Sequence, residues 1–242
     1  MISGFLLRCA GAALAACSVA AFAQQGGASG TTQRSYPVGT FDSVSAAGPH
    51  NVVVTVGGSP SVRAQGSADL LDRMEVVVED GDLEIRPKRE YRNNFRWGNQ
   101  PRSTFYVTAP ALKAASVAGS GDMKIDRIQG DRFSGAVAGS GKLDVASLRV
   151  SRASFSIAGS GDVSARGSAG DLDLSVAGSG NLRLREVASQ RASVSIAGSG
   201  NVDLNAADTA KVSIIGSGDV SVAGTARCTV SKIGAGRVNC AR

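Results

Sequence analysis

The chain reads Ser154-Phe-Ser-Ile-Ala-Gly-Ser-Gly-Asp-Val163 near its middle, and variants of this stretch recur through the second half of the sequence. Gly-Ser-Gly turns begin at Gly119, Gly139, Gly159, Gly178, Gly198 and Gly216, with a related Gly-Ala-Gly at Gly234. Successive turns are 20, 20, 19, 20, 18 and 18 residues apart. A near-constant period of this length is typical of a solenoid, in which each repeat forms one coil.

Apolar and small polar residues alternate on both sides of each turn. The residue two positions before the first glycine is Val or Ile in every Gly-Ser-Gly repeat, and the residue before that is mostly Ser. After the turn, two more apolar columns follow at alternate positions. A period of two indicates a strand with one buried face. Each repeat therefore predicts a strand, a glycine turn, a second strand and a variable connection.

These repeats predict an all-β fold, a right-handed parallel β-helix with about 18–20 residues per coil. Stacked coils would lie about 4.8 Å apart, so that like residues form columns. Glycine suits the corners because it adopts positive φ without a steric penalty. The alternative is an antiparallel β meander that uses the same turns. We prefer the parallel coil because successive turns look alike, whereas hairpins would tend to alternate two turn types.

The first half predicts a cap and the first coils of the same solenoid. Strands are expected at Asn51–Val56, Ser61–Ala64, Met74–Val78, Asp82–Arg86 and Phe105–Pro110. The turn at Glu79–Asp82 predicts a hairpin, and Asp69–Arg73 predicts a single helical turn. We therefore expect a flexible linker over 24–35, the cap and first coils over 36–115, and the Gly-Ser-Gly coils over 116–242.

The N-terminal residues 1–23 predict a signal peptide. One cation, Arg8, precedes an apolar run that ends in Ala21-Phe-Ala23, the small-residue pattern that a signal peptidase requires. Cleavage there would give a periplasmic or secreted protein. The alternative is an outer-membrane lipoprotein, since Leu14-Ala-Ala-Cys17 resembles a lipobox whose Cys17 would carry the lipid.

Export also bears on the cysteines and the charge. Cleavage after Ala23 leaves Cys228 and Cys240, which predict a disulfide in an oxidising compartment, with two buried free thiols as the alternative. Without Arg8, 25 Lys and Arg face 20 Asp and Glu, a net charge of +5. This modest excess permits contact with anionic envelope polymers and does not indicate nucleic acid.

No catalytic residue and no cofactor are expected. A serine nucleophile needs an adjacent base, and the chain has a single histidine, His50, whereas its turn serines are equivalent and suit a structural ladder. A glycan-active β-helix enzyme, the distant alternative, needs clustered carboxylates. The candidate carboxylates are scattered or alternate with basic residues: Asp126, Asp144, Asp171, Asp173 and Asp203.

The residue after each turn forms an external column of Asp122, Lys142, Asp162, Asn181, Asn201, Asp219 and Arg237. Repeated Gly-x-Gly-x-Asp turns bind calcium in other solenoids. Here Lys142 interrupts the column and no second carboxylate recurs beside it. We therefore expect no metal site, and we expect the Asp and Asn side chains to bond their own backbone. Calcium on the turns stays the alternative.

One segment differs from the rest of the sequence. Arg86–Arg102 carries six cations, one acid and three aromatic residues. Arginine beside aromatic rings suits the recognition of sugars and phosphates. The segment predicts a contact patch for an anionic glycan, lipopolysaccharide or an envelope protein, made of Arg89, Arg92, Phe95, Arg96, Trp97 and Arg102. The alternative is a surface loop that Trp97 pins to the solenoid.

The order of the motifs resembles the bacterial head GIN domain family of auto-transporter adhesins. The resemblance rests on Phe41-Asp-Ser-Val44, Asn51-Val-Val-Val54, Asp82-Leu-Glu-Ile85 and the repeated turns, and it extends from Tyr36 to Cys240. It implies a β-solenoid envelope protein without established catalytic activity. An adhesin-like module that binds by its surface is expected, and a purely structural or assembly element is the alternative.

Overall fold

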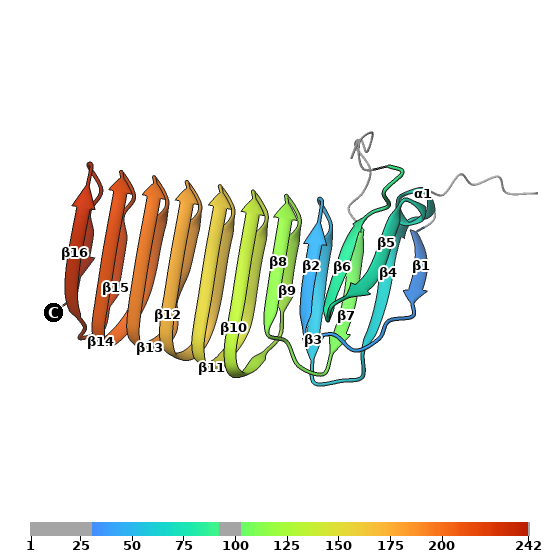
Figure 1. Cartoon of the computed structure of the whole chain (residues 1–242), viewed down its shortest axis with the longest axis horizontal. Helices are drawn as coiled ribbons and strands as arrows, with labels where there is room; N and C mark the ends of the chain where they lie inside the picture. The colour runs from blue at the N-terminus through green and yellow to red at the C-terminus, as the bar shows by residue number, and fades with distance from the viewer. Residues whose placement is uncertain (1–30, 92–102, 242) are drawn as a thin grey trace, which may run out of the picture.

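The computed structural model describes residues 31–91 and 103–241, which form an elongated β-solenoid (Figure 1). The coils of the second half comprise β8 (Ala114–Gly119), β9 (Asp122–Ile125), β10 (Ile128–Gly139), β11 (Lys142–Gly159), β12 (Asp162–Gly178), β13 (Asn181–Gly198) and β14 (Asn201–Gly216). The last coil comprises β15 (Val220–Ala223), β16 (Arg227–Ile233) and β17 (Val238–Cys240). These coils pair in parallel, so the predicted parallel stacking is confirmed and the antiparallel meander is not formed.

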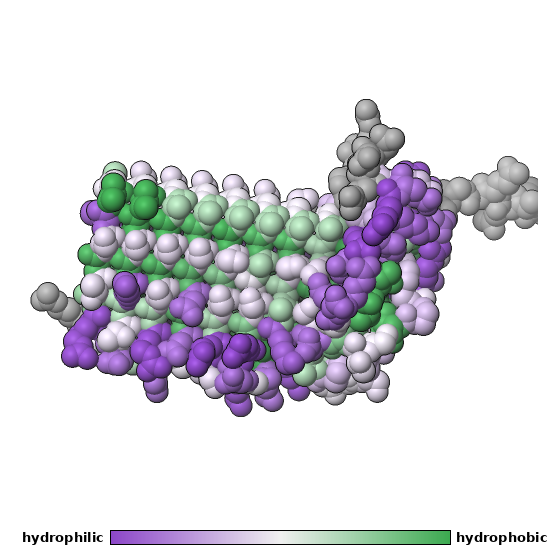
Figure 2. Space-filling view, viewed as in Figure 1, coloured by the Kyte–Doolittle hydropathy of each residue, from purple (hydrophilic) through white to green (hydrophobic). Residues whose placement is uncertain are grey.

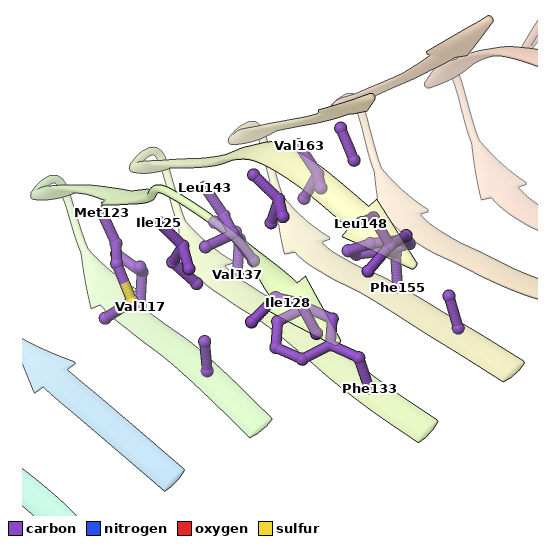
Figure 3. Packing of buried hydrophobic residues seen from close by; sticks show 14 of the residues in the cluster. Val117, Met123, Ile125, Ile128, Phe133, Val137, Leu143, Leu148, Phe155 and Val163 are labelled. Atoms are coloured by element: carbon purple, nitrogen blue, oxygen red, sulfur yellow. The ribbon is translucent and has the colours of Figure 1, made fainter. Parts of the chain in front are cut away.

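Like residues stack upon like residues along the rod. Gly139 in β10 lies opposite Gly119 on one side and Gly159 on the other. The interior is filled by aliphatic side chains and a few phenylalanines from facing strands, which point toward one another in Figure 3. At Gly135 a Cβ would lie 2.7 Å from the ring of Phe155, so this glycine leaves the space that the larger ring fills.

The first half continues the same stack but not in chain order. The coil of β2 (Ser43–Ala47) and β3 (Asn51–Val56) lies between two others. On one side it pairs with β8 and β9, and on the other with β6 (Asp82–Pro87) and β7 (Thr104–Ala109). The chain therefore passes outward from β3 and returns through β6 and β7 before it crosses to β8.

An antiparallel cap closes the N-terminal end of the rod. β4 (Ser61–Ser67) pairs antiparallel with β7, and β5 (Met74–Glu79) pairs antiparallel with β6 through the predicted Asp80-Gly81 turn. The short helix α1 (Ala68–Asp72) lies where a helical turn was expected and buries Leu70 and Leu71. Antiparallel strands and a helix here cover an end that would otherwise expose a sheet edge.

The structure corrects the predicted linker over 24–35. Residues Thr31–Tyr36 form strand β1, which pairs antiparallel with β4 along its whole length. Backbone pairing at a sheet edge accepts polar side chains, so the polar composition of this stretch did not reveal the strand. The rest of the linker and the predicted signal peptide, including Cys17, lie outside the described residues.

The last coil is less covered than the sequence pattern indicates. Val230 stacks on the buried Val212, as the repeat predicts, but it is 45 % exposed because none of the described residues forms a further coil above it. The interior of this coil is spanned by a disulfide between Cys228 and Cys240, whose Cα atoms lie 6.6 Å apart. Lys232 occupies a column that is Val or Ile in the earlier Gly-Ser-Gly coils, and its ammonium donates to the carbonyl of Gly236 at 2.8 Å.

Candidate binding surfaces

The Gly-Ser-Gly turns form a ladder of backbone contacts along one corner of the rod. The first glycine of each turn has φ between 115° and 134°. The amide of Ser160 donates to the carbonyl of Gly139 at 2.8 Å, and Ser140, Ser179, Ser199 and Ser217 repeat this bond in their turns. The last glycine is equally constrained, since a Cβ on Gly161 would lie 2.5 Å from the carbonyl oxygen of Gly141. The ladder thus uses the serine backbone and leaves the serine side chains at the surface.

The column after the turns bonds between coils instead of to its own backbone. Asn181 donates to Asp162 at 2.9 Å, and Asn201 donates to Asn181 at 3.1 Å. Asp219 accepts from the backbone amide of Arg237 at 2.9 Å. Our expectation of local turn bonds was therefore wrong for these residues. Stacking places like amides one coil apart, within reach of each other, and the oxygens become acceptors for the next coil.

A shallow polar hollow of ≈ 530 Å³ lies over the C-terminal part of this column. Its lining comes from Asn181, Arg183, Asn201, Asp203, Asp219, Val220, Ser221, Arg237 and Asn239. Arg183 lies 3.4 Å from Asp162, and Arg237 lies 3.6 Å from Asp219. Positive and negative side chains thus lie close together in this hollow. Its lining has no net positive charge that would favour an anion.

The predicted cationic patch is only partly described. Arg86 is held by three carboxylates of the β5–β6 hairpin: it lies 2.8 Å from Glu75 and from Glu79, and it also pairs with Glu84. These hydrogen bonds raise the pKa of the Arg86 guanidinium above its usual value. The charge of Arg86 is therefore largely neutralised by these glutamates. Arg92, Phe95, Arg96, Trp97 and Arg102 lie outside the described residues.

Arg89 lies at a second hollow, of ≈ 460 Å³, where the cap meets the solenoid. The floor is formed by Ala47, Gly48, Ala118 and Gly119, and Arg86, Pro87 and Arg89 form the wall. Figure 2 shows hydrophilic residues over the cap, beside the pale, even face of the coils. Among the described residues, no carboxylate forms an ion pair with Arg89. Of the cations predicted for the patch, Arg89 is the one that lies within the described residues.

A buried polar pair that sequence reasoning missed lies between the neighbouring coils of β3 and β7, near the cap. His50 Nδ1 is 2.6 Å from the Ser103 hydroxyl, and both residues are at most 2 % exposed. The His50 ring packs edge-on against Phe105, with centroids 5.4 Å apart. Burial lowers the pKa of His50 to about 4, so the imidazole is neutral at pH 7. The pair connects the starts of β3 and β7, and its burial suits a structural role.

Within the described ranges, no helix is long and apolar enough to cross a membrane.

A model of one protein family matches residues 40–226, under the description "Putative auto-transporter adhesin, head GIN domain". The chain belongs to the head GIN domain family. The match includes the N-terminal coils, the segment after Arg86 and all six Gly-Ser-Gly turns, so the family resemblance inferred from the motifs is confirmed. No curated protein matches this family member at a significant level.

Solved structures share the fold of this head GIN domain protein. A "putative adhesin" from Bacteroides fragilis has a TM-score of 0.82 at 23% identity, and the match covers 88% of this chain and 98% of that one. A "putative lipid binding protein" from Parabacteroides distasonis has a TM-score of 0.71 at 22% identity, covering 88% and 97%. A "putative adhesin" from the same species gives 0.69 at 19% identity, covering 88% and 97%.

Proposed function

We propose that this head GIN domain protein is an exported, non-enzymatic, adhesin-like module that binds an anionic envelope polymer by its surface. Adhesin is the name given to its family and to structural relatives. The ligand is an anionic glycan or the phosphorylated sugar of lipopolysaccharide. Lipopolysaccharide also agrees with the name of the relative called a lipid binding protein.

The observation that carries this proposal is the position of Arg89. This cation stands in the wall of a hollow, and no described carboxylate neutralises it, unlike the neighbouring Arg86. A guanidinium in a hollow can donate two parallel hydrogen bonds to a phosphate or carboxylate. The cations that follow it in the sequence, from Arg92 to Arg102, would extend the same contact along a polymer.

The test is binding of the purified protein to immobilised lipopolysaccharide and to an anionic glycan, measured by biolayer interferometry. Arg89→Ala combined with Arg96→Ala should weaken binding about 10-fold or more, because two charge-assisted contacts are lost. Binding should also weaken as salt rises from about 50 to 150 mM, since exposed charges are screened.

The matched control is Arg149→Ala combined with Arg185→Ala. Both arginines are exposed on the rod away from the cap, so this variant removes the same net charge without touching the proposed patch. If both double variants bind equally well, or if the protein binds neither ligand, the proposed function is wrong. Lipopolysaccharide binding without glycan binding would place the recognition in the lipid-linked phosphosugar.

A further inference from the structure

One column of outward-facing residues runs along the solenoid from β2 to β16, and its residues are larger at the C-terminal end. Its register follows from the strand pairing: Ala47, Ala118, Ala138, Ala158, Ala177, Ala197, Ile215 and Ile233. The side chains of Ile215 and Ile233 are 60% and 70% exposed. These two large aliphatic residues are exposed at positions that are Ala in the other coils of the column. They form an apolar protrusion, called here the knob.

The column lies on an even, mostly uncharged face of β2, β8, β10–β14 and β16, called here the flat face. The neighbouring column contains Ser45, Ser116, Ala136, Ser156, Ser175, Ser195, Ser213 and Ser231. A third column contributes two charges, Asp173 and Lys211. Figure 2 shows pale, regular rows that end in a strongly hydrophobic patch at the C-terminal end. Small side chains here permit a close approach by another flat surface.

The opposite end of the same column holds a hollow. Its floor includes Ala47 and Ala118, the first two positions of the column, and its volume is ≈ 460 Å³. The ridge of Arg86 and Pro87 bounds it on the side of the cap. The flat face therefore has the knob of Ile215 and Ile233 at one end. At the other end it has the hollow over Ala47 and Ala118, called here the hole, and the column positions between them carry Ala.

We propose that the flat face is a self-association surface, on which two copies pack face to face with their rods antiparallel. A two-fold axis parallel to the strands, between the coils of Ala158 and Ala177, keeps the columns aligned and reverses their order. Ile233 of each copy then meets Ala47 of the other, and Ile215 meets Ala118. Both knobs enter both holes, as an isologous interface requires. This inference goes beyond the proposed binding function and is tested separately from it. Because the dimer fills the hollow beside Arg89, dimerisation and ligand binding at that hollow should compete.

The size of the face agrees with a weak dimer. Eight strands about 4.8 Å apart give a length of roughly 34 Å, and three outward columns give a width of roughly 15 Å. The two copies together would bury on the order of 1,000 Å², which is near the lower limit for specific interfaces. We therefore expect a dissociation constant in the micromolar range. A core that is nearly free of charged residues is typical of such interfaces.

End-to-end stacking through the last coil is a less suitable arrangement. Lys232 stands in the interior column of β16, where a further coil would need Val or Ile. A charged residue that points inward at a terminal strand opposes further strand addition. The flat face has no such obstacle along its alanine positions.

Sedimentation velocity of the purified protein between about 1 and 200 µM tests the proposal. The protein should dimerise, and Ile215→Ser combined with Ile233→Ser should weaken dimerisation about 100-fold or more, because both knobs are lost. Tyr106→Ser is the control: Tyr106 is 42% exposed on β7, away from the flat face, and its replacement should leave the dimer intact.

An exchange of knob and hole tests the antiparallel register. Ala118→Ile alone should block dimerisation by filling the hole, and adding Ile215→Ala should restore it, since the two residues face each other across the axis. Circular dichroism verifies that each variant is folded. A wild-type protein that stays monomeric at 200 µM overturns the proposal. So does a dimer that tolerates the double Ser variant, or an exchange that fails to restore association.

Discussion

At the scale of single residues, the buried imidazole of His50 makes stability depend on pH. Its pKa is about 4 in the folded protein, because burial disfavours the charged ring, against the usual value of 6.5. Between these values the unfolded chain binds a proton that the folded chain does not. The stability associated with neutral His50 is therefore present above pH 6.5 and is lost as the pH falls toward 4.

We expect this loss to reach roughly 3 kcal/mol by pH 4, at about 1.4 kcal/mol for each unit of pKa difference. Urea unfolding of the wild type and of His50→Gln at pH 7, 5.5 and 4.5 measures it. Carboxylates contribute equally to both proteins, so the difference between the two curves isolates His50. Parallel curves for the two proteins would show that the ring is protonated in the folded state as readily as in the unfolded one.

At the scale of the structural element, the turn depends on the absence of a side chain at its last glycine. A Cβ on Gly161 would lie 2.5 Å from the carbonyl oxygen of Gly141 and 2.5 Å from a methyl of Val137. Gly161→Ala should therefore lower the free energy of unfolding by about 1–3 kcal/mol, as overpacking does elsewhere. Ser160→Ala, one residue away and exposed, should change it by less than about 0.5 kcal/mol. Equal effects of the two changes in thermal and urea unfolding would contradict the ladder of close backbone contacts.

At the scale of the whole molecule, stability should vary along the rod. Each coil contacts mainly its neighbours, so local stability is the sum of nearby contributions. The cap closes one end, whereas the last coil depends on the disulfide between Cys228 and Cys240 and exposes Val230. The C-terminal coil is therefore the least protected part of the second half.

Replacing both cysteines with Ala should loosen this end alone. Hydrogen exchange should become faster in β16 and β17, while amides in β12 and β13 keep their protection, because opening is local in a repeat protein. Mass spectrometry of peptides from the wild type and the variant provides the comparison. A uniform acceleration along the rod would mean that the solenoid unfolds as a single cooperative unit.

Much of the solenoid could be predicted because its coils repeat. Stacking places identical environments one above another, so the same alternation and the same glycines must return every 18–20 residues. The period, the strands and the corners could be predicted for this reason. The bridge between Cys228 and Cys240 was predicted on other grounds, from the two cysteines that remain after export. The Asp80-Gly81 hairpin could also be predicted, since its turn requires residues that tolerate positive φ.

Contacts between distant, unlike segments were decided only by the tertiary structure. The sequence gives no sign that β2 and β3 lie between later strands, that His50 meets Ser103, or that three glutamates hold Arg86. Of the patch predicted from Arg86–Arg102, Arg89 lies within the described residues, and its contact with a ligand stays a prediction. Likewise, Ile215 and Ile233 become a knob only because register aligns them with Ala47 and Ala118. The local sequence pattern determines the strands and turns of each coil. The order of the coils and the structure at the ends of the stack depend on contacts between distant segments, which the repeat does not encode.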